Sequence, residues 1–126
     1  MFNLSGKNAV ITGAGSGIGR AVALLFGKQG AAVHVVDISE ENANHAAAEI
    51  IENGGQAFPY TCDVTNQSQV VEIYNQVGRI DILVNSAGIS HIGKADTTSA
   101  QDFDRIVSVN IKGVYNSLFA AIPLMK

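Results

Sequence analysis

The stretch TGAGSGIG, residues Thr12 to Gly19, decides how this sequence folds. It follows a short β-branched run that begins at Asn8, and it leads into a segment whose apolar residues recur at helical spacing. Gly13 is expected to permit a tight turn, Gly17 to let the backbone approach a phosphate closely, and Gly19 to let the helix pack closely on the strands. The stretch predicts a strand, a turn and a helix whose N-terminal amides can hold a pyrophosphate, with a plain glycine-rich turn as the alternative.

Strands and helices alternate along the rest of the chain. The expected strands are 8–12, 31–37, about 56–61 and 80–85. The last of them, IDILVN, is a continuous apolar run typical of a strand buried on both faces. The expected helices are 17–29, an alanine-rich segment from near Glu40 that stops at Gly54, and about 66–77.

Two capping patterns mark further helix starts. Asp37 with Glu40, and Thr98 with Gln101, have the spacing in which an N-cap side chain and a residue three positions later satisfy each other's backbone N–H groups. From Thr98 the helical periodicity continues to about residue 125, with a break expected near residues 110–113.

This alternation predicts the fold class. Short connections between strands and helices imply a parallel sheet with right-handed crossovers and helices on both faces, which is a doubly wound α/β (Rossmann) fold. Residues 1–126 form one domain in which four strands and their helices are present. Because ligands bind beyond the carboxyl ends of such strands, the loops that start at Gly13, Asp37, Asp63 and Asn85 should line one site.

Asp37 points to the kind of dinucleotide. It ends the second expected strand about 20 residues after the glycines, where a carboxylate can accept hydrogen bonds from the adenosine ribose hydroxyls. A 2′-phosphate would be repelled there, and neither Ser16 nor Ile38 offers a basic side chain to offset the repulsion. NAD is therefore predicted rather than NADP; the alternative is that Asp37 only caps a helix.

Five motifs occur in a fixed order: TGAGSGIG, Asp37, CDV at 62–64, NSAG at 85–88 and VNIKGVY at 109–115. In this order and spacing the sequence resembles the short-chain dehydrogenase/reductase family over its whole length. The resemblance implies hydride transfer between a nicotinamide and a secondary alcohol or ketone.

The resemblance also implies residue roles. The acid that matches Asp63 accepts a hydrogen bond from the adenine amino group, and Val64 contacts the ring; capping of the next helix, which Thr65 could also do, is an equal and compatible alternative. Asn85 ties neighbouring strands together.

The remaining implied roles lie near the nicotinamide end. Ala87 and Gly88 pass close to the cofactor, while Ser86 departs from the commonest family residue. Asn110 is grouped with the catalytic residues and helps to hold a water in the proton relay. Together, the expected cofactor-binding residues are Gly13, Ser16, Gly17, Ile18, Gly19, Asp37, Asp63, Val64, Asn85, Ala87 and Gly88, and the expected catalytic residue is Asn110.

The general acid/base that the family uses is missing. The resemblance implies a Tyr with a Lys four residues later and a Ser beside the substrate oxygen, but the residues four positions after Tyr60, Tyr74 and Tyr115 are not lysines. The chain is therefore expected to be the cofactor-binding half of a longer enzyme and inactive alone; a short, non-catalytic dinucleotide-binding or interaction module is the alternative. An open apolar edge at the fourth strand favours homo-oligomerisation.

Composition excludes other functions. The net charge is −3 and the eight basic residues are scattered, which argues against nucleic acid. Cys62 is the only cysteine, and no apolar run approaches the roughly 20 residues of a membrane span, so a reducing, cytoplasmic location is expected. No metal site is indicated: His34 is expected to pack in a strand and His45 to be solvated, and His91 is a weak candidate for a substrate-facing residue.

Overall fold

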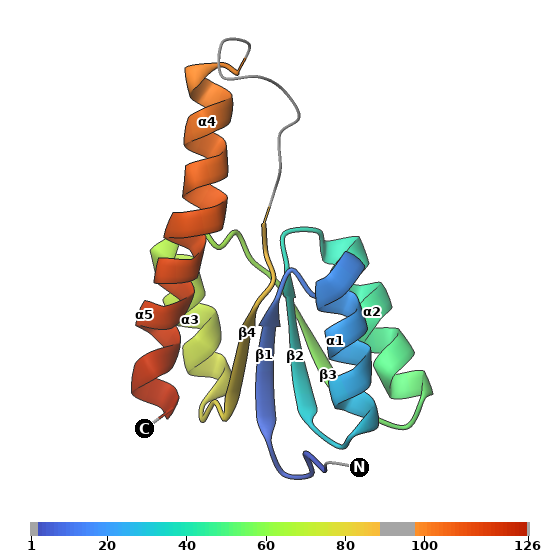
Figure 1. Ribbon diagram of the computed structural model, residues 1–126. Helices are drawn as coiled ribbons and strands as arrows, with labels where there is room; N and C mark the ends of the chain where they lie inside the picture. The colour runs from blue at the N-terminus through green and yellow to red at the C-terminus, as the bar shows by residue number, and fades with distance from the viewer. Residues whose placement is uncertain (1–2, 89–97, 126) are drawn as a thin grey trace.

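The computed structural model describes residues 3–88 and 98–125 (Figure 1). Strands and helices alternate as the sequence predicts. In chain order the elements are β1 (Asn8–Thr12), α1 (Gly17–Lys28), β2 (Ala32–Asp37), α2 (Glu40–Glu52), β3 (Gln56–Thr61), α3 (Gln67–Val77), β4 (Ile82–Asn85), α4 (Ala100–Val107), a π-helical turn (Ser108–Lys112) and α5 (Gly113–Met125).

The four strands form one parallel sheet in the order β3-β2-β1-β4. Thr12, at the end of β1, pairs with Val36 on one side and with Asn85 on the other. Asp37 pairs with Thr61 in β3, so the carboxyl ends of all four strands lie level at one edge of the sheet. The chain order reverses at β1, which places a topological switch point beside the loop that follows Thr12.

Helices cover both faces of the sheet (Figure 1). Ala9 and Ile11 of β1 join the core that α1 and α2 close, whereas Val10 joins the core that α3 and α5 close. This split follows from the two-residue period of a strand, which sends neighbouring side chains to opposite faces. The expectation of a doubly wound α/β fold is confirmed.

Strand β4 differs from its prediction. It begins at Ile82 rather than at residue 80, its apolar side chains are half-buried, and Asn85 is exposed. The prediction of a strand buried on both faces is wrong because β4 is an edge strand of the described sheet, with β1 as its only neighbour there. Ile80 is fully buried, but it belongs to the core beneath α3 and α5 rather than to the sheet.

The helix starts also differ. Asp37 and Thr98 are not N-caps; the capping side chains are Ser39 for α2, Asn66 for α3 and Ser99 for α4, and each accepts a hydrogen bond from the N–H three residues later. All three caps place a side-chain oxygen within reach of an otherwise unpaired helix N–H. Both predicted capping pairs are therefore wrong by one or two residues, and the Asp37 carboxylate is left for another task.

The last helical segment runs from Ala100 to Met125 without interruption. Instead of the expected break, a π-helical turn at Ser108–Lys112 joins α4 to α5. Such turns insert an extra residue into a helix and are frequent at functional sites. Within residues 3–88 and 98–125, no helix combines the length and apolar character that a membrane crossing requires.

Two of the three histidines are described. His34 is buried in β2, where its ring stacks on Phe58 and its nitrogens lie 3.2 Å from the Tyr60 hydroxyl and 3.4 Å from Oδ1 of Asn8. Burial lowers the pKa of His34. His45 is exposed on α2, so both expectations hold; His91 lies outside the residues that the structure describes.

Candidate functional site

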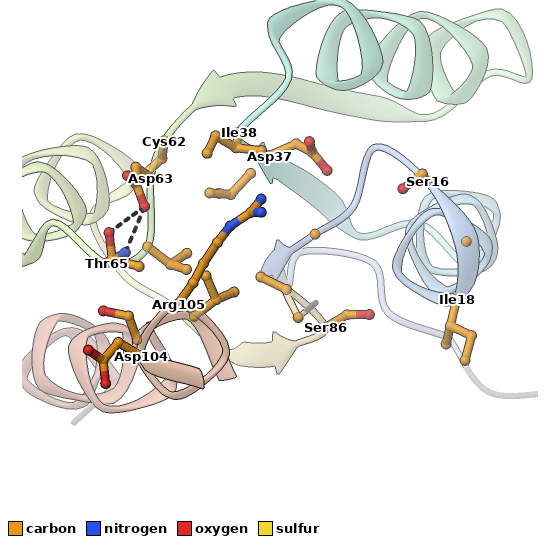
Figure 2. Close-up of a pocket in the computed structure, with 18 of the residues that line it drawn as sticks. Ser16, Ile18, Asp37, Ile38, Cys62, Asp63, Thr65, Ser86, Asp104 and Arg105 are labelled. Carbon is orange, nitrogen blue, oxygen red and sulfur yellow. Dashed lines mark hydrogen bonds between the residues drawn. The ribbon is translucent and has the colours of Figure 1, made fainter. Parts of the chain in front are cut away.

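A cleft of about 860 Å³ opens at the carboxyl ends of the strands (Figure 2). It brings together nine of the twelve expected site residues, from loops that are distant in the sequence: Gly13, Ser16, Gly17, Ile18, Asp37, Asp63, Val64, Ala87 and Gly88. Gly19, Asn85 and Asn110 are not among the residues that line it.

Two glycines of the loop have a positive φ, and two leave no room for a side chain. Gly13 has a φ of +64°, and a Cβ atom there would lie 2.7 Å from the backbone nitrogen of Ala87. Gly17 also has a positive φ, +57°, and a Cβ atom on it would meet no atom within 4 Å. A Cβ atom on Gly19 would collide with the carbonyl oxygen of Gly13, so the helix packs against the turn itself. Larger residues would strain the loop at Gly13 and Gly17 and could not fit at Gly13 or Gly19.

The N-terminus of α1 opens onto this cleft without a side-chain cap. Ser16 occupies the N-cap position in an extended conformation, makes no side-chain capping hydrogen bond and is exposed. No acidic residue lies in the first turn of α1, whereas α2 has Glu40 and Glu41 there. The first N–H groups of α1 and the positive end of its dipole are thus available to an anion.

The Asp37 carboxylate is held in place by two backbone N–H groups. Asp37 is 9% exposed; Oδ2 accepts a hydrogen bond of 2.9 Å from Gly15, and Oδ1 accepts one of 2.9 Å from Ser39. The carboxylate therefore links the glycine loop to the turn before α2. Sequence reasoning missed Gly15, although a fourth glycine in TGAGSGIG was a visible signal.

Asp63 forms a local turn rather than a helix cap. Its Oδ1 accepts hydrogen bonds from the backbone N–H of Thr65, at 3.0 Å, and from the Thr65 hydroxyl, at 2.7 Å. Its own N–H donates to Oε1 of Gln69. Among the described residues nothing donates a hydrogen bond to Oδ2, so this oxygen remains an acceptor at the cleft.

Val64 is fixed from beneath by α5. Nδ2 of Asn116, a residue that is 2% exposed, donates a 2.9 Å hydrogen bond to the Val64 carbonyl, and Oδ1 of Asn116 accepts one of 3.2 Å from Gln67. A Cβ atom on Gly113 would lie 2.7 Å from a methyl carbon of Val64, so the loop sits directly on the helix. The only signal for Asn116 was an amide in an apolar helix, and it was overlooked.

Thr12 joins β1 to the loop after β4. It is 1% exposed, and its Oγ1 accepts hydrogen bonds from the N–H groups of Ser86, at 3.1 Å, and Ala87, at 3.2 Å. Asn85 pairs with Thr12 through the parallel strand ladder. The structure thus gives a strand-linking role to Thr12, which sequence reasoning did not single out, and the side-chain role of Asn85 stays a prediction.

Asn110 lies in the π-helical turn, beside Gly88 of the cleft. It is exposed, and its Oδ1 would lie 3.2 Å from a Cβ atom on Gly88. The loop after β4 and the last helical segment therefore meet at these two expected site residues. A side chain on Gly88 would crowd the Asn110 amide, which favours glycine at that position.

One wall of the cleft was not predicted. Gln101, Asp104, Arg105 and Ser108 reach it from α4 and the turn that follows. Figure 2 shows the Arg105 side chain extending from α4 into the cleft, whereas Asp104 projects away from it. Arg105 was missed because no local pattern connects α4 with the end of β2.

Two buried titratable side chains, Cys62 and Tyr74, are uncharged at neutral pH. Burial, with a smaller contribution from the Asp63 carboxylate, raises the pKa of the Cys62 thiol to about 11. Burial also raises the pKa of Tyr74 to about 12, despite its 2.7 Å hydrogen bond to Ser117. Cys62 is therefore an uncharged wall residue, and Tyr74 is a core residue.

Known proteins share both the sequence and this arrangement. The profile of the family described as short chain dehydrogenase matches residues 7–126. The 3-oxoacyl-[acyl-carrier-protein] reductase FabG of Thermotoga maritima is 41% identical over 128 residues, which cover 98% of this chain and 52% of that protein. The 7alpha-hydroxysteroid dehydrogenase of Escherichia coli is 38% identical over 135 residues, 100% of this chain and 52% of that protein.

Solved structures agree. The crystal structure of hydroxysteroid dehydrogenase from Escherichia coli matches with a TM-score of 0.91 and 38% identity, over 98% of this chain and 54% of that one. A dehydrogenase/reductase from Sinorhizobium meliloti 1021 matches with a TM-score of 0.93 and 32% identity, over 98% and 51%. The chain spans about half the length, or less, of the first curated relatives that it matches. By sequence and by structure, the chain belongs to the short-chain dehydrogenase/reductase family.

Proposed function

We propose that this chain is the cofactor-binding half of an NAD-dependent oxidoreductase that transfers hydride between nicotinamide and a secondary alcohol or ketone. Its relatives are oxidoreductases, and its family binds a nicotinamide dinucleotide. The choice of NAD rests on one observation, the Asp37 carboxylate that Gly15 and Ser39 hold at the cleft.

The described residues fit a dinucleotide. The uncapped N-terminus of α1 would hold the pyrophosphate, with Ser16 and Gly17 beside it. Asp37 would accept hydrogen bonds from the adenosine ribose, since each of its oxygens has a second lone pair. Asp63 and Val64 would contact the adenine, and the loop at Ala87–Gly88 would lie beside the nicotinamide half.

NAD is favoured over NADP because Asp37 has little freedom to move. Turning the carboxylate away would leave the buried N–H of Gly15 without its acceptor, at a cost of about 1–3 kcal/mol. If the carboxylate stays, it repels a 2′-phosphate on the neighbouring ribose carbon. NADP binding therefore costs free energy whether the carboxylate turns away or stays, and NAD binding requires neither the movement nor the repulsion.

Calorimetric titration of the purified protein with NAD and with NADP tests this proposal. NAD should bind more tightly by at least tenfold, and the ratio should narrow at high salt because screening weakens the repulsion. Tighter binding of NADP would contradict the role given to Asp37. Binding of neither nucleotide would contradict the cofactor site itself.

The chemistry would need groups that the 126 residues do not include. Nicotinamide supplies the hydride donor or acceptor when the cofactor is bound. Asn110, next to Gly88, would hold a water of the proton relay, but the chain has no Tyr followed four residues later by Lys. The chain alone is therefore expected to bind the cofactor without turning over an alcohol.

A non-catalytic dinucleotide-binding module is the second candidate, favoured only by that missing pair. Intact mass of the native protein separates the two: a mass well above 13.2 kDa supports the longer enzyme, and a mass near it supports the module. NAD-dependent oxidation of a secondary alcohol by the longer form, absent from the 126-residue chain, would complete the case for the enzyme.

We also propose that the protein forms homo-oligomers in the cytoplasm. The location is inferred from the single cysteine. Association is inferred from a row of exposed apolar side chains along the last helical segment. Ile111 lies in the π-helical turn, and α5 carries Tyr115, Leu118, Phe119, Ile122 and Met125. Surfaces of this kind favour association. Sedimentation equilibrium should give a multiple of the chain mass, and Phe119→Glu should shift it toward the monomer.

A further inference from the structure

Arg105 brings a positive charge to the adenosine end of the cleft. It lies on the exposed side of α4, one helical turn before Val109, and both residues line the cleft. In Figure 2 its side chain extends across the opening toward Ile38 and Asp37, with Asp63 on its other side. The guanidinium thus lies between the loops that follow β2 and β3.

The guanidinium has no protein partner in residues 3–88 and 98–125, although the carboxylates of Asp37, Asp63 and Asp104 line the same cleft. No ion pair within 4.0 Å joins Arg105 to any of the three. Asp37 already accepts a backbone hydrogen bond on each oxygen, and Oδ1 of Asp63 is directed at Thr65. Arg105 is therefore free to contact a ligand.

The surface around the guanidinium suits a flat, uncharged ring. Val36, Ile38, Val64 and Val109 line the cleft with aliphatic side chains, and the Cys62 thiol, whose pKa is raised to about 11, adds no charge at neutral pH. A planar cation over an apolar floor is an arrangement that binds aromatic rings, because the guanidinium stacks on one ring face while the other is desolvated.

Resting on the proposed function, we propose that Arg105 is a cofactor-binding residue whose guanidinium stacks on the adenine ring of NAD. Asp63 would face the ring edge and Val64 the opposite ring face, so the base would be held from three sides. In other proteins, Arg side chains stack on nucleobases, and this contact stabilises binding without distinguishing one base from another.

Two other roles for Arg105 fit the structure less well. A contact with the pyrophosphate is disfavoured because Ser16 and Ile18, at the N-terminus of α1, lie on the other side of the cleft in Figure 2. A contact with a 2′-phosphate would require that group to sit beside Asp37, whose carboxylate is fixed by Gly15.

Three variants test the proposal in the native protein. Arg105→Met removes the charge and the planar group but keeps the length of the side chain; Arg105→Lys keeps the charge but loses the plane. Arg79→Met is the control, because Arg79 is exposed and precedes β4 at the opposite end of the strands, and within the described part of the chain its side chain pairs with Asp81 alone. Melting temperatures of all three should match the wild type within a few degrees.

Dissociation constants are measured for NAD, NADP and adenosine, which has no phosphate. Arg105→Met should raise the dissociation constants of NAD and of adenosine by the same factor, roughly 5- to 30-fold. Arg105→Lys should recover less than half of that loss on a logarithmic scale, and Arg79→Met should change nothing.

Other outcomes would overturn the stacking role. Full recovery by Arg105→Lys would show that charge alone matters, and unchanged adenosine binding would show that Arg105 does not touch the base. A larger loss for NADP than for NAD would assign Arg105 to the 2′-phosphate. If the wild type bound neither NAD nor adenosine, the proposed cofactor site itself would be wrong. If the wild type bound both and Arg105→Met bound them equally well, the cofactor site would stand and only the stacking role of Arg105 would be refuted.

Discussion

The backbone N–H of Gly15 donates a 2.9 Å hydrogen bond to Oδ2 of Asp37, which joins the glycine loop to the end of β2. Two parts of the expected cofactor site are therefore one unit. The loop that would hold the pyrophosphate fixes the carboxylate that would select the ribose. A substitution in the glycine loop should therefore alter the position of the Asp37 carboxylate, and a substitution of Asp37 should alter the loop.

Gly15→Ala tests this coupling. A Cβ atom at Gly15 would lie 2.8 Å from Oδ2 of Asp37 and 2.7 Å from Cβ of Asn42, so the carboxylate or the loop must shift. We expect NAD affinity to fall about tenfold, and selectivity over NADP to fall with it, because Asp37 loses its fixed position. Calorimetric titration with both nucleotides measures the two effects.

Gly54→Ala is the matched control. Gly54 has a φ of +88° and no atom within 4 Å of a Cβ position, and it lies at the far end of α2. The change should cost about 1 kcal/mol of stability through backbone strain and leave both dissociation constants unchanged. If Gly15→Ala behaved in the same way, the coupling between the loop and the carboxylate would be refuted.

Asp37→Arg should reverse the cofactor preference. The substitution removes the repulsion of a 2′-phosphate and supplies a guanidinium that can bind it, so NADP should bind more tightly than NAD. Asp37→Asn should narrow the preference without reversing it, because an amide neither repels nor attracts the phosphate strongly. Glu52→Gln, an exposed change at the end of α2, alters the net charge by the same one unit as Asp37→Asn and is the control for that variant. Retention of the wild-type ratio in Asp37→Arg would contradict the prediction.

The sequence predicts the elements well where the pattern is local. The expected bounds of β1 and β3 coincide with Asn8–Thr12 and Gln56–Thr61 because each strand is a short run between residues that favour turns. Burial of β4 was mispredicted because the number of neighbours of a strand is a property of the whole sheet. The predicted caps at Asp37 and Thr98 were wrong for a different reason. Ser39 and Ser99 are equally suitable acceptors nearby, and only the residue at which each helix starts decides which side chain caps it.

The candidate site divides in the same manner. Glycines and acids at strand ends could be found because they belong to the loops that the fold brings together. Arg105 and Asn116 could not, because each reaches the site from the last helical segment, and no spacing in the sequence predicts which helical face meets which loop. Long-range contacts between elements are the part that required the structure.

Asn116 should stabilise the loop at Val64. Asn116→Leu would leave the Val64 carbonyl and the Gln67 amide without their partners, at an expected cost of about 1–3 kcal/mol in the free energy of unfolding. Because Val64 lines the cleft, adenosine affinity should fall as well. Asn75→Leu, at an exposed position on α3, should change stability by less than about 0.5 kcal/mol. Equal effects of the two substitutions in urea unfolding would argue against this role.

His34 should make the fold sensitive to mild acid. Burial lowers the pKa of His34 below its ordinary value of 6.5, so the unfolded chain binds a proton at a higher pH than the folded chain does. The stability contributed by neutral His34 is complete above pH 6.5 and is lost as the pH falls from there through the folded-state pKa. Urea unfolding at pH 7.5 and at lower pH values should therefore show a decline that His34→Phe reduces, because phenylalanine can keep the stack on Phe58 and does not titrate. His45→Phe, at an exposed site on α2, should leave the decline as it is in the wild type. A decline of the same size in His34→Phe would assign the acid sensitivity to other groups.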